Sequence, residues 1–207
     1  QIEQGEMRVE KVEIANLSRK SVEVSFSKVT PGAQFSVSPS VIPPQGKATL
    51  TYSVDTKNTG EKLWGNNTFG ADVVIDGKST GKRVEIEGLI KENFSGYSQE
   101  EKRTGPLPQF VSSSASIGDC NGKEIKKVKF TFTNVGKREF RIYKMDSSEK
   151  GCSFSYPEVT AGGKKGEIEV KVDTSKGAGE VLYIISVITN SPTRPIINLF
   201  ITGNIEK

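Results

Sequence analysis

Short stretches in which apolar and polar residues alternate recur along the whole chain. They cover residues 9–15, 21–29, 47–54, 126–133, 139–145 and 166–172. A period of two places alternate side chains on opposite faces of a β-strand, and strands rich in Val, Ile and Phe are bounded by Gly, Ser, Thr and Asn. In residues 167–171, for example, Glu and Lys alternate with Ile168 and Val170. Helical periodicity is nearly absent, so the pattern predicts an all-β chain.

The alternating pattern occurs twice. Asn16 and Asn134 each follow an alternating stretch and precede a small basic turn, 118 residues apart. Val54-Asp55-Thr56 recurs as Val172-Asp173-Thr174 at the same spacing. Ile86-Glu87-Gly88 recurs as Ile201-Thr202-Gly203, 115 residues apart. Six or seven short strands per copy predict two immunoglobulin-like β-sandwiches in tandem.

The repeat predicts the domain boundaries: a sandwich over residues 1–91, a linker over 92–108 and a second sandwich over 109–207. Residues 110–119 read as an opening strand of the second copy, whereas Ile2 is already level with Cys120. We therefore expect either that the first copy lacks most of its first strand or that this strand comes from residues outside the given sequence, and we expect the chain to be a processed or trimmed product. The prolines at the end of the linker stiffen it, and Phe94 and Tyr97 either pack on one domain or lie in a loose connector.

Charge and composition argue against several functions. The chain has 29 Lys and Arg against 25 Asp and Glu, with both signs sharing strand faces, which indicates solubility and no nucleic-acid groove. No apolar run is long enough to span a bilayer. There is no histidine, so the usual nucleophile activation and the usual zinc ligand are absent. We predict no catalytic residue, no metal site and no cofactor.

Two candidate chemical motifs have simpler structural interpretations. Asp55 and Asp173 are predicted to be turn residues that accept hydrogen bonds from their own backbone. Asp76-Gly77-Lys78-Ser79-Thr80 resembles the tail of a phosphate-binding loop but lacks its upstream glycine and following helix, so we predict a hairpin turn there.

Two sets of residues remain candidates for a bond or a ligand. Cys120 and Cys152 fall in connections at the same end of the second sandwich, which predicts either a disulfide or two unrelated small buried thiols. Trp64, Asn66 and Asn67 form a segment without a counterpart in the second copy. A Trp beside amides can stack on a sugar, although a single Trp in a sandwich is more often part of the core.

Several runs of the second copy resemble a known family. These are residues 130–138, 161–174, 187–192 and 201–203, together with Gly151-Cys152. They resemble the bacterial family called domain of unknown function 1573, which is similar to the ASH/Hydin/major-sperm-protein group of immunoglobulin-like folds. Members often carry Cys-Gly-Cys where this chain has Lys150-Gly151-Cys152, so one cysteine of that pair is missing. The resemblance implies an envelope or secreted setting in Gram-negative bacteria, and no established activity.

The sequence thus predicts a non-enzymatic interaction or structural module, periplasmic, outer-membrane-associated or secreted, that binds an envelope protein through strand edges and end loops. The alternative is a carbohydrate-binding accessory module that uses Trp64, Asn66 and Asn67 for a glycan. A third interpretation is a structural spacer without a ligand.

Overall fold

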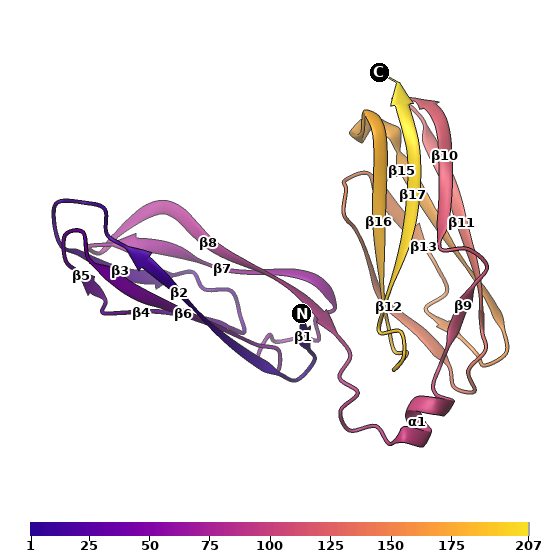
Figure 1. Ribbon diagram of the computed structural model, residues 1–207, viewed down its shortest axis with the longest axis horizontal. Coiled ribbons are helices and arrows are strands. Elements are labelled where there is room, and N and C mark those ends of the chain that lie inside the picture. The colour runs from indigo at the N-terminus through magenta and orange to yellow at the C-terminus, as the bar shows by residue number, and fades with distance from the viewer. Residues whose placement is uncertain (207) are drawn as a thin grey trace. The chain divides into compact units, whose positions relative to one another are not determined.

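A computed structural model describes residues 1–206 of the chain (Figure 1). The chain divides into two compact units, the first repeat, Gln1–Ile90, and the second repeat, which begins at Lys91. Each unit consists of two β-sheets, as the alternating pattern predicts. The fold is therefore all-β with two immunoglobulin-like sandwiches in tandem.

The first repeat packs a five-stranded sheet against a three-stranded one. The five-stranded sheet has the order β1 (Ile2–Glu3), β8 (Lys78–Lys91), β7 (Gly65–Ile75), β3 (Val22–Ser27) and β5 (Val41–Ile42). The other sheet has the order β2 (Met7–Ala15), β6 (Lys47–Asp55) and β4 (Ala33–Ser38). The predicted hairpin at Asp76-Gly77 joins β7 to β8, and both residues have the positive φ, 50° and 73°, that such a turn needs.

The second repeat has the same plan with one additional strand in the described residues. One sheet has the order β10 (Ser114–Asn121), β17 (Ile196–Glu206), β16 (Gly179–Thr189), β12 (Phe140–Ser147) and β14 (Val159–Thr160). The other has the order β13 (Cys152–Ser155), β15 (Lys165–Asp173), β11 (Ile125–Asn134) and β9 (Pro108–Phe110). A 3₁₀ turn, Thr174–Lys176, follows β15.

The repeat extends to individual hydrogen bonds. The Asn16 amide donates to the carbonyls of Lys20 and Ile42, at 2.7 and 3.0 Å. The Asn134 amide donates to the equivalent carbonyls of Arg138 and Thr160, at 2.8 and 3.0 Å. Both asparagines are buried, so each stabilises a chain crossing whose carbonyls would otherwise be left without donors.

The predicted turn roles of the two aspartates are confirmed. Asp55 accepts from the backbone N–H of Lys57 at 2.9 Å, and Asp173 accepts from that of Ser175 at 3.0 Å. The threonine that follows each aspartate donates to a carbonyl in the turn after β1 or β10, Thr56 to Glu6 at 2.9 Å and Thr174 to Glu124 at 3.0 Å. These contacts establish that Ile2 and Cys120 occupy equivalent positions.

The stretch predicted as a linker belongs to the second repeat and contains a short helix that the pattern analysis missed. Helix α1 (Gln99–Thr104) begins with a capping box between Ser98 and Glu101. The Ser191 hydroxyl donates to the Pro106 carbonyl at 2.6 Å, and the Tyr143 hydroxyl donates to Glu92 at 2.5 Å. Phe94 and Tyr97 stack edge to face on each other.

Candidate functional site

The two repeats differ most in how one side of each sandwich is closed. In the second repeat, β10 pairs in parallel with β17 from Ser114 to Asn121, and Ala115 and Ile117 pack against the core (Figure 1). In the first repeat, the equivalent edge of β8 carries only the two-residue β1. We call the side between β2 and β8, where β10 has no counterpart beyond β1, the open side.

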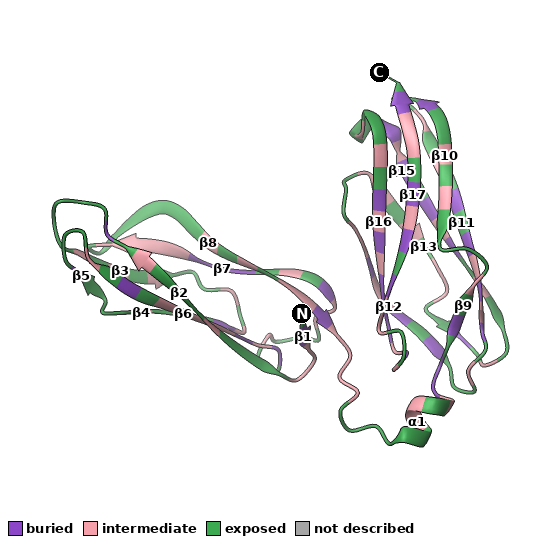
Figure 2. Ribbon diagram, in the orientation of Figure 1, coloured by how far each residue is buried: buried purple, intermediate pink, exposed green. Residues whose placement is uncertain are grey.

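Burial along β2 shows the consequence of this difference (Figure 2). Val12 lies opposite Leu50 on the face that carries buried Val54 and Ala48, so it points toward the core. It is nevertheless 48% exposed, whereas its counterpart Phe130 in the second repeat is 2% exposed. The first core is correspondingly small; its buried cluster is Ile2, Ala33, Val54, Phe69 and Ile90.

A cavity of about 200 Å³ lies on the open side. Ile2, Val54, Ile86 and Gly88 contribute apolar surface to it, and Tyr52 adds a ring. We call this cavity the Gly88 socket. Gln1 and Glu87 add polar surface, so the lining, which comes from both sheets, combines apolar and polar groups.

A charged pair, Arg8 and Glu10, also lines the socket. The Arg8 guanidinium lies 2.8 Å from the Glu10 carboxylate and also donates to the Gln1 carbonyl at 3.1 Å. Both residues are core-facing positions of β2. The second repeat also has a charged residue, Lys126, at the position of Arg8, but it has the buried Val128 at the position of Glu10.

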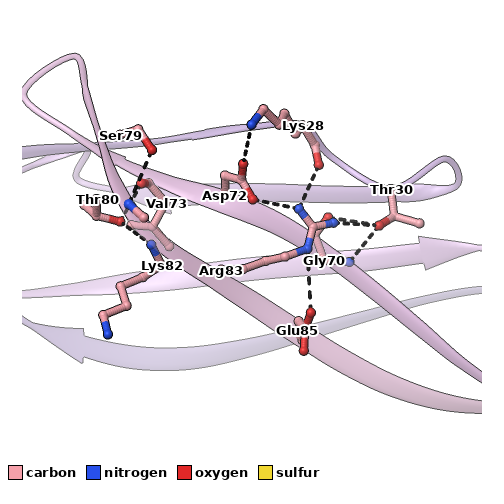
Figure 3. A network of polar contacts seen from close by, with 11 residues as sticks. Lys28, Thr30, Gly70, Asp72, Val73, Ser79, Thr80, Lys82, Arg83 and Glu85 are labelled. Carbon is pink, nitrogen blue, oxygen red and sulfur yellow. Dashed lines mark hydrogen bonds and ion pairs between the residues drawn. The ribbon is translucent and has the colours of Figure 1, made fainter.

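A polar network holds β8 in place before it reaches the socket (Figure 3). Arg83 of β8 donates to Asp72 at 2.8 Å, to the Lys28 carbonyl at 3.2 Å and to the Thr30 hydroxyl at 3.1 Å. Gly70 is required beside it, because a Cβ there would lie 2.6 Å from the Val84 carbonyl oxygen. The Arg83 guanidinium and then the Lys28 ammonium lower the pKa of the Asp72 carboxyl.

The two asparagines of the Trp64 segment lie on opposite faces of the sheet. Asn66 is exposed and Asn67 half-buried, and as successive residues of β7 they point to opposite faces of the sheet. The Asn67 amide donates to the carbonyls of Trp64 and Gly65, at 3.2 and 2.9 Å. Trp64 itself is half-buried. The amide of Asn67 thus supports the local turn around Gly65.

The disulfide predicted between Cys120 and Cys152 is not formed; both are free thiols. Cys120 lies on β10 and points to the Asn204 carbonyl at 3.7 Å, whereas Cys152 begins β13 in the other sheet. Burial raises the pKa of the Cys152 thiol. The two cysteines therefore act here as small core-lining side chains, the alternative that the sequence left open.

Hollows at one end of the second repeat are lined mainly by turn residues. One of about 590 Å³ lies over Asn121, Lys123, Glu124 and Ser175. The Glu124 carboxylate accepts a hydrogen bond from the Asn121 amide at 3.1 Å and pairs with the Lys126 ammonium. The Ser175 backbone N–H donates to Asp173. Residues 1–206 contain no group of three or more acidic, cysteine or histidine residues that could hold a metal ion. No helix in the described chain is long and apolar enough to cross a membrane.

Pattern analysis missed the residues of the socket, Arg8, Glu10 and Gly88. The available signal was the match of Gly88 with Gly203 combined with the short opening strand of the first repeat. The match does not show by itself that the two glycines have different neighbours. Gly203 packs against Ile117, which lies 86 residues earlier in the sequence and contacts it only in the folded sheet.

Comparison with known proteins agrees with this architecture. Residues 108–205, most of the second repeat, match the model of the family described as "Protein of unknown function (DUF1573)". No curated protein matches the chain.

A crystal structure of a protein of unknown function from Porphyromonas gingivalis W83 is similar over 98% of this chain and 93% of that one, with 15% identity and a TM-score of 0.75. The ASH/PapD-like domain 7 of human CEP192 is similar over 48% of this chain and 86% of its own, with 11% identity and a TM-score of 0.38. The first of these shows the shared two-sandwich fold.

Proposed function

We propose that this protein is a non-enzymatic interaction module that binds an extended segment of a partner protein along the free edge of β8. The observation that carries the proposal is the contrast between the repeats: β17 is covered by the eight-residue β10, whereas β8 is covered only by Ile2–Glu3. A strand edge with unpaired backbone N–H and C=O groups binds another strand through main-chain hydrogen bonds.

The open side also supplies apolar surface for such a strand. Half-exposed Val12 and the Gly88 socket lie beside the free edge, so an added strand would bury apolar area as well as form backbone hydrogen bonds. The non-enzymatic part of the proposal is supported by the lack of histidine and by the use of Asp55 and Asp173 as turn caps.

We further propose that the module acts in the bacterial envelope or outside the cell, the setting that the resemblance of the second repeat to this family implies. Fractionation of the native bacterium with an antibody against the protein tests this placement. Recovery in the periplasmic, outer-membrane or secreted fraction is expected, and recovery in the cytosol alone would contradict it.

Site-specific photocrosslinking tests the proposed edge. A benzophenone amino acid replaces Glu87, an exposed residue on the free part of β8, in the full chain expressed in its own host. The matched control places the same group at Thr202, the equivalent exposed residue on β17, whose edge β10 already covers.

We expect a discrete protein adduct from position 87 and none from position 202, because only the first edge is free. Adducts of equal yield from both positions, or from neither, would overturn the proposal that the β8 edge is the binding surface.

A further inference from the structure

The two sandwiches also differ in the outer strand of the smaller sheet. In the first repeat this strand is β4, which pairs with β6 and has no neighbour on its other side among residues 1–206 (Figure 1). In the second repeat the equivalent edge strand is β13, which pairs with β15. An edge strand presents unpaired backbone N–H and C=O groups, and most proteins protect such an edge by keeping the strand short or by placing charged side chains on it.

Charged residues closely flank β13 but not β4. Glu149 and Lys150 precede β13, Glu158 follows it, and the strand is only four residues long. By contrast, residues 29–46, which contain all six residues of β4, carry no charged side chain and form the longest uncharged stretch of the chain. The β4 edge therefore has no charge that would repel a second strand.

The register of β4 on β6 determines which backbone groups are free. The Asp55 N–H donates to the carbonyl of Gly32, the residue before β4, at 2.7 Å. Hydrogen-bonded positions alternate along an antiparallel pair, so every second residue counted from Gly32 bonds to β6. The N–H and C=O groups of Phe35 and Val37 therefore point away from β6, toward the free edge.

The polarity of β4 is symmetric about Ser36. Half-buried Phe35 and Val37 flank this residue, and exposed Gln34 and Ser38 lie one position further out on each side. In an antiparallel pair of two β4 strands with a two-fold axis at Ser36, Phe35 of one copy lies opposite Val37 of the other. The free backbone groups of these two residues then meet, and an aromatic ring opposite a β-branched side chain is a favourable cross-strand pair.

The same arrangement ends at matching positions on both sides. The next outward-facing pair places Pro39 of one copy opposite Ala33 of the other. Pro39 has no N–H, and the Ala33 N–H already donates to the Thr30 carbonyl at 3.0 Å. The pairing is therefore confined to the centre of the strand. Because both copies use the same edge about a two-fold axis, the contact closes as a dimer and does not extend into a fibre.

We propose that two copies of this chain associate through β4, paired antiparallel about Ser36, so that their three-stranded sheets join into one six-stranded sheet. The occupant of the edge is a second copy because polarity, free backbone groups and strand ends are all symmetric about one residue, as a self-complementary contact requires. One strand edge per copy is a small interface, so the association should be weak. It uses a different edge from β8 and stands independently of the proposed function.

Charge substitution at Ser36 tests the dimer. The two Ser36 side chains form a non-hydrogen-bonded pair, in which opposing side chains lie closest. Ser36→Lys and Ser36→Glu each place like charges opposite each other, whereas an equimolar mixture of the two variants places Lys opposite Glu. The matched control is Ser155→Lys, at the equivalent exposed position of β13.

Sedimentation velocity of the full chain from about 10 μM to about 1 mM measures the association, a range that covers weak dissociation constants. Ser36 is exposed on the outer face of its sheet, so the variants should keep their fold, which far-UV circular dichroism checks. We expect the unchanged chain and Ser155→Lys to dimerise equally. Each Ser36 variant alone should dimerise at least about 10-fold more weakly, and the mixture should recover the dimer.

Three results would overturn the proposal. An unchanged chain that stays monomeric at the highest concentration shows that β4 does not pair with itself. A dimer that is insensitive to Ser36→Lys, or that Ser155→Lys weakens as much, lies on another surface. Two Ser36 variants that are monomeric alone and remain monomeric when mixed show that the two Ser36 side chains do not face each other.

Discussion

Tyr183 is a position at which the two repeats differ and at which the residue of the second repeat lowers its stability. Its side chain is 1% exposed, and its hydroxyl has no hydrogen-bond partner in the described structure. Its counterpart in the first repeat, Phe69, is equally buried and has no polar atom in its side chain. A buried hydroxyl without a partner costs about 1–3 kcal/mol in desolvation.

We therefore expect Tyr183→Phe to raise the free energy of unfolding of the second repeat by about 1 kcal/mol. The control is Tyr143→Phe, which removes a hydroxyl that donates to Glu92 and should lower stability. Urea unfolding followed by far-UV circular dichroism measures both variants. A loss of stability in Tyr183→Phe comparable with that of Tyr143→Phe would show that the Tyr183 hydroxyl is satisfied in solution.

At the scale of elements, the turn contacts and the short opening strand of the first repeat could be predicted from the sequence, whereas the socket could not. Asp55 and Asp173 bond to a backbone group two residues away, so their role is visible in a local motif. Helix α1 also had a local signal, the Ser98–Glu101 capping box, which the search for strand periodicity missed. The socket instead depends on which strand covers β8, a pairing between segments far apart in sequence.

The ion pair between Asp72 of β7 and Arg83 of β8 should make the stability of the first repeat depend on pH. Its carboxyl pairs with Arg83 at 2.8 Å and with Lys28 at 3.3 Å, and these cations lower its pKa in the folded state. A carboxyl with a lowered folded pKa contributes stability that is fully present above its unfolded pKa of about 3.9 and is lost as pH falls through the lowered value.

Asp72→Asn should accordingly lower the urea midpoint of the first repeat at pH 7 and flatten its decline below about pH 4. Arg83→Gln removes the guanidinium that pairs with Asp72. The double variant should therefore lose less stability than the sum of the losses in the two single variants. Additive losses across pH 3–7 would show that the ion pair contributes nothing in solution.

The whole molecule joins two sandwiches of unequal completeness. The first core is a small cluster with an open side, while the second buries residues on every long strand and is closed by β9 and β10. Because buried apolar area is the main source of stability, the first repeat should unfold at lower urea concentration than the second. Trp64, the single tryptophan, lies in the first repeat and reports on it alone.

We expect tryptophan fluorescence to change at the first of two transitions and far-UV circular dichroism to follow both. A ligand that binds only the folded first repeat raises that repeat's free energy of unfolding by RT ln(1 + [L]/Kd), where [L] is the free ligand concentration. A synthetic peptide with the sequence of residues 108–119, which include most of β10, would add to the free edge of β8 and should therefore move the fluorescence midpoint upward and leave the second transition in place. Coincident transitions would show that the repeats unfold together. A shift confined to the second transition would show that the peptide binds the second repeat. A shift of the first transition alone would show that the open side is a binding surface whose occupation completes the first sandwich.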